Sequence, residues 1–182
     1  MVRLNIATRP LLSHLSNIII LMNRVQIQEV LSKSDLKEFI YLPEKLHRNH
    51  VNWVPPIYKD EWDYFNPKKN RAFSYCDTIV MLARCDGKSV GRIMGIINHR
   101  YNDEKKEKVA RFSLFECIND REVSEMLLSY IEKWAMDKGM TKIIGPFGMC
   151  YQDPIGFMTE GFNERPSLTA KYNFEYMIKL LQ

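Results

Sequence analysis

Two carboxylates are the clearest candidates for chemistry in this sequence. Glu160 lies in the stretch Thr159 to Phe162, and Glu116 lies at the end of an apolar run. Both are predicted close to strand ends, where a substrate can approach. A carboxylate in such a place can take a proton from an amine, which is the base that acyl transfer to an amine requires. We therefore rank Glu160 first and Glu116 second as the candidate base, with a solvated carboxylate as the alternative for each.

Signatures of other common reactions are missing from the sequence. It has no GxSxG, no Walker loop, no HExxH and no dinucleotide-binding GxGxxG. The four cysteines are widely separated, form no CxxC pair and have no histidine at zinc-finger spacing. We expect no metal, and free thiols of a reducing compartment, with the cytoplasm as the default. Asp153 is expected to cap a turn, and His99 is the only histidine that we place near the sheet, in a surface role.

Length and charge limit the function classes. The chain has 182 residues, the size of one domain, and its net charge of +4 comes from 26 basic and 22 acidic residues spread along it. We therefore expect no nucleic-acid partner. The apolar stretch near the N-terminus is interrupted by His14, Ser16 and Asn17, so we expect no membrane span. Strand-like alternation begins after Met22, so we interpret residues 1–21 as an extension, not native or disordered, before a domain over 22–182.

The first half of that domain predicts a strand, a helix and an irregular aromatic segment. Apolar and polar residues alternate over 25–30, which indicates a half-buried strand. Helical spacing follows, with Ser32 or Ser34 as the N-cap, and we expect Pro43 to end or kink the helix. Residues 49–73 are rich in aromatics and prolines, with a short helix near Ile57 to Tyr64. This segment is either a substrate wall or core packing.

The second half predicts a meander followed by a crossover. Two apolar runs, 78–83 and 90–97, flank Asp86-Gly87, which is typical of a tight hairpin. A charged loop over 101–108 leads to a third strand over 110–118, with Phe112, Leu114 and Glu116 on one face. A helix capped by Asn119 or Asp120 should run to a stop at Gly139. The strand over 141–144 should then lie parallel to the third strand. A long loop and a helix over 172–181 complete the chain.

Both the order of these elements and several phrases carry a resemblance. The phrases are NWVPP (52–56), DGKSVGRI (86–93), RFSLFE (111–116), GMTKIIGP (139–146), GFMTEGF (156–162) and YNFEY (172–176). Over residues 25–182 the chain resembles a bacterial GNAT-like family of uncharacterised proteins. The resemblance implies an α/β (α+β) fold of the acyl-CoA N-acyltransferase type, a mixed central sheet flanked by helices that lacks its C-terminal strands.

The same resemblance implies an acid and a cofactor loop. A tyrosine on the helix over 172–181 would protonate the leaving thiolate, with Tyr176 before Tyr172 as the match. Acetyl-CoA or another acyl-CoA would be the cofactor, bound at the loop that leads into the helix beginning at Asp120. This loop comprises Phe115, Glu116, Cys117, Ile118, Asn119, Asp120 and Arg121. This stretch has none of the glycines of the usual pyrophosphate loop, and its acidic side chains would repel phosphate, although Arg121 and the helix amides partly offset this.

Three functional hypotheses follow. The first is an N-acyltransferase that carries an acyl group from acetyl-CoA or another thioester to a small-molecule or peptide amine. The second is a non-catalytic GNAT-fold module that binds a ligand or a protein. The third is one half of a tandem aminoacyl-transferase-like protein. Because the strand over 141–144 would leave an open sheet edge, we also expect a homodimer through that edge.

Overall fold

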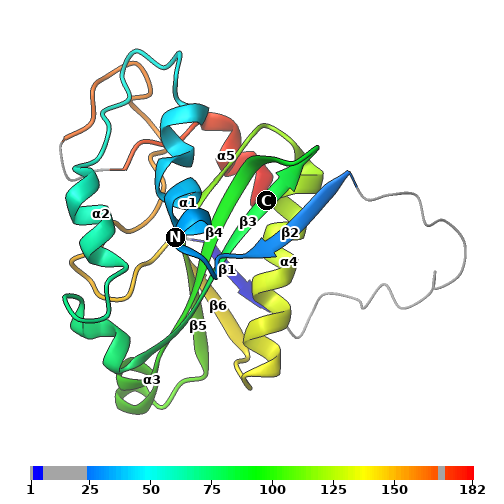
Figure 1. Ribbon diagram of the computed structural model, residues 1–182. Helices are drawn as coiled ribbons and strands as arrows, with labels where there is room; N and C mark the ends of the chain where they lie inside the picture. Colours follow the sequence, from blue (N-terminus) through cyan, green and yellow to red (C-terminus); the bar gives the residue numbers. More distant parts are fainter. Residues whose placement is uncertain (1, 6–23, 168–170) are drawn as a thin grey trace, which may run out of the picture.

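The computed structural model describes residues 2–5, 24–167 and 171–182. They form a mixed sheet with helices on both faces (Figure 1), as expected for an α+β protein. The strands stand in the order β1-β6-β5-β4-β3-β2 and span Val2–Asn5 (β1), Val25–Glu29 (β2), Cys76–Cys85 (β3), Lys88–Asn98 (β4), Val109–Cys117 (β5) and Lys142–Gly145 (β6). Strands β2 to β5 pair antiparallel, and β6 pairs parallel to β5, which confirms the crossover.

The helices divide between the two faces of the sheet. They span Lys33–Leu46 (α1), Tyr58–Tyr64 (α2), His99–Lys105 (α3), Arg121–Asp137 (α4) and Glu175–Leu180 (α5), with a 3-10 helix over Arg71–Ser74. Helix α4 covers one face and α1 the other (Figure 1). Within the described ranges, no helix has the length and apolarity that a membrane span requires.

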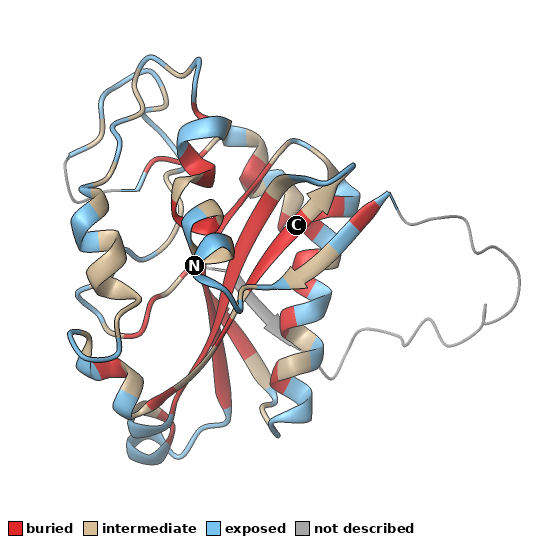
Figure 2. Ribbon diagram, in the orientation of Figure 1, coloured by how far each residue is buried: buried red, intermediate tan, exposed pale blue. Residues whose placement is uncertain are grey.

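The β3–β4 hairpin has the predicted turn. Cys85 faces Lys88 across two residues with positive φ, Asp86 at 49° and Gly87 at 74°. Alternate residues of both strands then point to opposite faces, as a period of two requires. Met81 and Ile93 pack under α4, whereas Leu82 and Met94 pack under α1. Figure 2 shows the resulting buried stripe through the middle of the sheet.

Helix α4 begins and ends where its sequence predicts. The Asp120 side chain accepts a hydrogen bond from the Glu122 amide at 2.9 Å, and Gly139 follows the helix with a φ of 77°. The helix buries one stripe of side chains over β2 to β5, namely Val123, Leu127, Leu128, Ile131 and Ala135. At about 1.5–3 kcal/mol per large aliphatic side chain, this stripe is a main source of the stability of the sheet.

Helix α1 does not end at Pro43, which was one of the two outcomes expected there. The capping box is present, with Ser32 accepting from the Asp35 amide at 3.0 Å, but the helix continues past Pro43 to Leu46. A proline has no N–H to donate, so the carbonyl four residues before it loses its helical partner. Here that carbonyl belongs to Phe39, and Arg92 of β4 donates to it through Nη1 at 2.8 Å. The sheet thus supplies the hydrogen bond that the proline removes.

The charged segment expected as a loop over 101–108 is largely helix α3. Asn98 caps it by accepting from the Tyr101 amide at 2.9 Å, and Lys106 ends it with a φ of 54°. Asn102 ties the helix to β5, because its Nδ2 donates to the Val109 carbonyl at 3.0 Å and its Oδ1 accepts from the Val109 amide at 3.2 Å. The charged residues show no apolar periodicity, so the sequence did not predict this helix, which Asn98 and Asn102 stabilise.

We expect Asn102→Ala to lower the free energy of unfolding by about 2 kcal/mol. The change leaves the buried N–H and C=O of Val109 without these partners, and each unsatisfied buried group costs roughly 1–3 kcal/mol. Urea denaturation followed by circular dichroism measures the loss. Asn119→Ala, at an exposed position, is the control and should stay within about 0.5 kcal/mol of the wild type. Equal losses for the two variants would contradict the role of Asn102.

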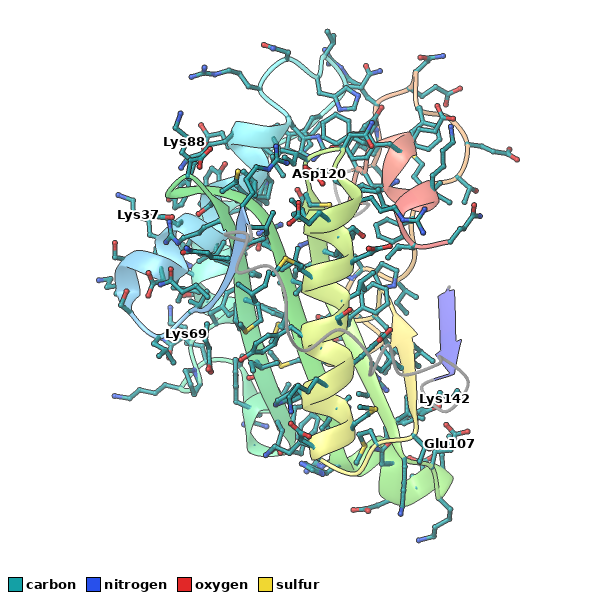
Figure 3. The ribbon with its side chains drawn as sticks, turned by 90° about the vertical axis from the view of Figure 1, so that its right-hand side faces the viewer. Lys37, Lys69, Lys88, Glu107, Asp120 and Lys142 are labelled. Atoms are coloured by element: carbon teal, nitrogen blue, oxygen red, sulfur yellow. The ribbon has the colours of Figure 1, made fainter. Side chains whose placement is uncertain are left out.

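The outer edge of β6 is not open, in contrast to our expectation. Strand β1 pairs with it antiparallel, from Val2 opposite Gly145 to Asn5 opposite Lys142. Figure 3 shows β1 beside β6, close to the ion pair that joins Lys142 to Glu107 at 3.6 Å. The edge proposed for a homodimer is therefore taken by the chain itself. Residues 1 and 6–21 of the proposed extension lie outside the described residues, so the interpretation of 1–21 stays a prediction.

Strand β5 carries a bulge that changes which side chains share a face. Arg92 pairs with Glu116 but Met94 pairs with Ser113, so β5 has one extra residue opposite β4. Leu114 sits in this bulge with a φ of 52°. A bulge shifts the alternation of side chains by one position. Phe112 therefore shares the α4 face with Phe115 and Cys117, and the prediction that Phe112, Leu114 and Glu116 lie together is wrong.

Candidate functional site

A cavity of about 460 Å³ lies on the α1 side of the sheet, next to the bulge in β5. The β5–β6 ladder ends at Arg111 opposite Ile144, and one further hydrogen bond joins the Phe147 amide to the Phe112 carbonyl at 2.8 Å. Beyond that point, residues 113–116 of β5 and Pro146 after β6 line the cavity. The place where the two parallel strands cease to pair thus opens into a space large enough for a small organic ligand.

The rest of the wall comes from helices α1 and α2, the segment between them, Arg92 of β4 and the segment between β6 and α5. Most of it is apolar or aromatic, and these side chains are Pro43, Trp53, Val54, Pro55, Pro56, Ile57, Tyr64, Leu114, Phe115, Pro146, Pro154, Phe157 and Tyr172. The sequence allows two interpretations of the aromatic segment over 49–73, a substrate wall and core packing. Trp53, Pro55 and Pro56 contribute to the cavity wall.

One buried carboxylate lies in this wall, held by two basic side chains. Glu116 Oε1 accepts from Arg92 Nη2 at 2.7 Å, and Glu116 Oε2 lies 3.4 Å from His47 Nε2. The Arg92 side chain is 3% exposed and that of His47 is fully buried. Burial alone would raise the pKa of Glu116, but Arg92 and His47 outweigh it and hold the pKa at about 2. Glu116 is therefore an anion at neutral pH.

His47 is fixed by a stack of rings. Trp53 lies parallel to it at 5.3 Å between centroids, and Phe174 lies on it at 4.3 Å. His50 also stacks on Phe174, at 4.8 Å, and its Nδ1 is 3.3 Å from Nδ1 of His47. Burial lowers the pKa of His50, and the neighbouring His47 lowers it further. The segment after α1 and the segment before α5 are joined through these rings.

Other polar side chains lie in the cavity wall, among them Glu61, Asp153 and Lys171. Lys171 Nζ lies 3.6 Å from Glu61 Oε1, and burial lowers the pKa of Lys171 while Glu61 opposes this. Asp153 accepts from Tyr64 Oη at 3.3 Å and from the Cys150 amide at 3.2 Å, which agrees with the turn-capping role expected for it. The polar groups of the wall are thus largely engaged with one another, in an otherwise apolar space.

The structure separates the two candidate bases. Glu116 lines the cavity, whereas Glu160 is exposed in the loop after β6 and does not line it. Glu116 lies next to the end of β5, as predicted, and its residue is only 8% exposed. His99 is not the only histidine near the sheet. His47 packs beneath β5 against Glu116, while His99 pairs with Asp77 at the surface.

The two candidate acids also differ in position. Tyr172 lines the cavity but precedes α5, so its expected place on that helix is wrong, and its hydroxyl donates to the Phe162 carbonyl. Tyr176 lies on α5, is half-buried, does not line the cavity and donates to the Cys117 carbonyl at 2.8 Å. Burial raises the pKa of Tyr176 above its ordinary value, so this hydroxyl keeps its proton at neutral pH.

The seven residues of the predicted cofactor loop do not form one surface. Phe115 and Cys117 are buried in the core and Ile118 packs against it, while Asn119 is exposed. Arg121 is exposed and pairs with Glu125 at 2.8 Å. Of the seven, only Phe115 and Glu116 line the cavity.

Sequence reasoning missed Arg92 and His47, although both left a signal. Arg92 is the one charged residue between Val90 and Ile97, a run that predicts a strand covered on both faces, so it required a buried partner. His47 continues the face of α1 that contains Phe39 and Pro43 at a spacing of four residues, which predicts that it turns inward. Within the described residues, no cluster of three or more His, Cys, Asp or Glu side chains has a geometry that could hold a metal ion.

Comparison with known proteins gives two bacterial relatives. No protein-family model matches the chain. It is 28% identical over 148 residues to a bacterial ceramide synthase of Caulobacter vibrioides (strain NA1000 / CB15N), covering 81% of this chain and 38% of the relative. It is 29% identical over 140 residues to protein YghO of Escherichia coli K12, covering 77% of this chain and 36% of that protein. The chain thus spans less than two-fifths of the length of either relative.

Proposed function

We propose that this chain is a GNAT-like domain that transfers an acyl group from a thioester to an amine within the cavity. The observation that carries the proposal is the position of the cavity, past the end of the β5–β6 ladder and beside the bulge at Leu114. Unpaired backbone at this point can hydrogen-bond an extended thioester, and the buried Glu116 faces the same space. Both groups that the reaction must bring together have a place there.

The reaction forms one bond and breaks one. The amine nitrogen attacks the thioester carbonyl carbon, a C–N bond forms, and the C–S bond breaks with its electron pair on sulfur. Glu116 is positioned to take the amine proton, which makes it the proposed base in place of Glu160. Tyr176 remains the proposed acid for the thiolate, because its protonated hydroxyl donates to the carbonyl of Cys117, the residue after Glu116.

The Caulobacter relative supports an amine as the acceptor. A ceramide is an amide, so the name ceramide synthase agrees with acyl transfer to nitrogen. The wall of prolines and aromatic rings favours an acceptor or an acyl chain with an apolar body, because its burial there removes apolar surface from water. We therefore propose an apolar amine as the acceptor within the small-molecule class.

The N-terminus of α4 does not fit the pyrophosphate of coenzyme A. Its Glu122 amide is already bonded to the Asp120 side chain, which also pairs with Arg24, so an anion occupies the place that phosphate would need. Figure 3 shows Asp120 at this end of the helix. The proposal therefore draws on the thioester of the donor and assigns no role to its phosphates.

We expect the enzyme to accept acyl donors that lack the nucleotide. The acetyl thioester of N-acetylcysteamine should react with a primary alkylamine at a kcat/KM within about tenfold of that of acetyl-CoA. The phosphates of coenzyme A are proposed to make no contacts with this protein, so a donor without them loses no binding energy. Mass spectrometry of the amide product, with heat-denatured protein as the blank, gives both rates. A preference of about a thousandfold for acetyl-CoA would show that the phosphates are bound, and an absence of amide from either donor, with longer acyl chains included, would reject acyl transfer.

A non-catalytic binding module is the second candidate, and the self-capped α4 N-terminus favours it. In that case an alkylamine or a thioester should bind without turnover. Trp53 lies in the cavity wall, so its fluorescence provides a direct measure of occupancy. Binding that is saturable and is accompanied by no amide product would support the module over the enzyme.

A further inference from the structure

A file of side chains leads from the cavity wall towards the surface. It starts at Glu116, which lines the cavity, passes through the buried His47 and ends at His50, which is half-buried. The steps are 3.4 Å from Glu116 Oε2 to His47 Nε2, and 3.3 Å from His47 Nδ1 to His50 Nδ1. Each pair of neighbours is close enough to exchange a proton after a small movement.

The proton positions along this file depend on one another. Two Nδ1 atoms that face each other at 3.3 Å can bond only if one carries a proton and the other does not. When His50 is the donor, a neutral His47 carries its proton on Nε2 and points it at Glu116. When His47 is the donor, its Nε2 is bare and can receive a proton from Glu116. The file therefore has two arrangements that differ by the shift of every proton by one place.

The surroundings restrict the file to this route. Among the described residues, neither His47 Nε2 nor Glu116 Oε2 has a hydrogen-bond partner within normal limits, so the two atoms have only each other. Arg92 holds the other carboxylate oxygen at 2.7 Å, and the stack of Trp53 and Phe174 on His47 keeps its ring from turning. A static ion pair would not require a second histidine behind the first.

We propose that Glu116, His47 and His50 form a proton path between the cavity and the surface. Its use in catalysis rests on the proposed acyl transfer. Glu116 takes the proton that the attacking amine loses, His47 accepts it on Nε2 and passes the proton on its Nδ1 to His50, and His50 releases one to water. The leaving thiolate takes its proton from Tyr176. The reverse transfer then brings one proton inward to Glu116, which replaces the proton that Tyr176 lost, so each cycle uses the path once in each direction and ends where it began.

The path also resolves a difficulty with Glu116 as the base. A carboxyl group with a pKa of about 2 holds a proton poorly at neutral pH, which makes it a weak general base by itself. His47 lies behind it, with Nε2 3.4 Å from Glu116 Oε2, and can accept the proton that Glu116 does not keep. His47 and His50 therefore act through Glu116 and do not touch the substrate.

Variants of His50 test the path, because this residue is half-buried and its loss leaves the core intact. His50→Phe keeps a ring that can stack on Phe174 but carries no nitrogen, and His50→Ala leaves room for added imidazole. We expect both to lower kcat by about tenfold or more with KM unchanged, and imidazole to restore activity in His50→Ala only. His99→Phe, at a surface histidine away from the cavity, should match the wild type. Full activity in His50→Phe would overturn the path.

A measurement without substrate separates this inference from the proposed reaction. Nitrogen NMR of the histidine rings, after dialysis against a chelator, should show one proton shared by the two Nδ1 atoms. Glu116→Gln should change the proton position on His50, which it does not touch. The path would be overturned if the two histidine rings shared no proton. It would also be overturned if the rings were joined only after zinc is added, because a bound metal ion and not a proton would then connect them. Linked rings with no acylated amine would leave the path standing and reject the acyltransferase.

Discussion

Replacing Arg92 with methionine should lower the free energy of unfolding by about 3–5 kcal/mol. The change removes the guanidinium that holds Glu116 at 2.7 Å and leaves a carboxylate in a wall where its residue is 8% exposed. A buried charge that loses its partner costs several kcal/mol. The Phe39 carbonyl, already deprived of its helical donor by Pro43, also loses its hydrogen bond. Urea denaturation at pH 7 measures the total.

The effect of Arg92→Met should depend on pH in a defined direction. The pKa of Glu116 is depressed from 4.5 to about 2 in the folded wild type, so the stability that its ionisation provides is complete above about pH 4.5. That contribution is lost as the pH falls through 2. In Arg92→Met the opposing burial raises the pKa of Glu116, and the carboxyl takes up a proton. The difference in the free energy of unfolding between Arg92→Met and the wild type should therefore decrease steadily from pH 5 to pH 2.

A double variant provides the control for this prediction. In Arg92→Met with Glu116→Gln, neither the guanidinium nor the buried carboxylate remains, so the variant should recover much of the stability that the single change loses. Lys142→Met removes a basic residue from a partly exposed pair and should cost less than about 1 kcal/mol. If the free energy of unfolding that the double variant loses equals the sum of the losses of the two single variants, Arg92 and Glu116 do not stabilise each other and the prediction is contradicted.

The second large effect is expected at Gly145, the last residue of β6. A Cβ built there would lie 2.4 Å from Cδ1 of Phe112 and 2.6 Å from the Phe112 carbonyl oxygen. The backbone atom cannot swing aside, and Phe112 is fully buried. We expect Gly145→Ala to lower the free energy of unfolding by about 3 kcal/mol, the upper part of the range for overpacked cores.

Thermal unfolding gives the measurement for Gly145→Ala. For a chain of this length the loss corresponds to a decrease in Tm of roughly 6–12 °C. Gly87→Ala is the matched control, because no atom lies within 4 Å of its added Cβ and only its positive φ opposes the change, at about 1 kcal/mol. A Tm for Gly145→Ala at or above that of Gly87→Ala would show that β5 and β6 move apart freely at this point.

Local signals were sufficient for most of the elements. The Asp86-Gly87 turn, the caps at Ser32 and Asp120 and the stop at Gly139 each act within a few residues, so their physical chemistry is visible in the sequence. The parallel pairing of β5 and β6 followed from the handedness of the crossover. Helix α3 was missed because its stabilising contact joins Asn102 to Val109, across a charged stretch that has no apolar periodicity.

The composition of the site depends on contacts that no local pattern records. The bulge falls at Leu114, although a residue with a positive φ is more often a glycine or an asparagine, so nothing marked the shift that turns Glu116 into the cavity. Arg92 donates hydrogen bonds to a carbonyl on α1 and to a carboxylate on β5, and only the folded sheet brings these two acceptors close to it. Sequence reasoning found Glu116 and Tyr172 as candidates but not what surrounds them.

The cavity draws its walls from segments that are far apart in the chain. The loop between α1 and α2, the bulge of β5 and the stretch after β6 meet around one space and are joined there by few regular backbone hydrogen bonds. A molecule that fills this space contacts all of them in the folded chain and none of them in the unfolded chain. By thermodynamic linkage, an occupant at a hundred times its Kd would add about 2.7 kcal/mol to folding. A ligand that fills this cavity would in that sense be part of the core of the protein.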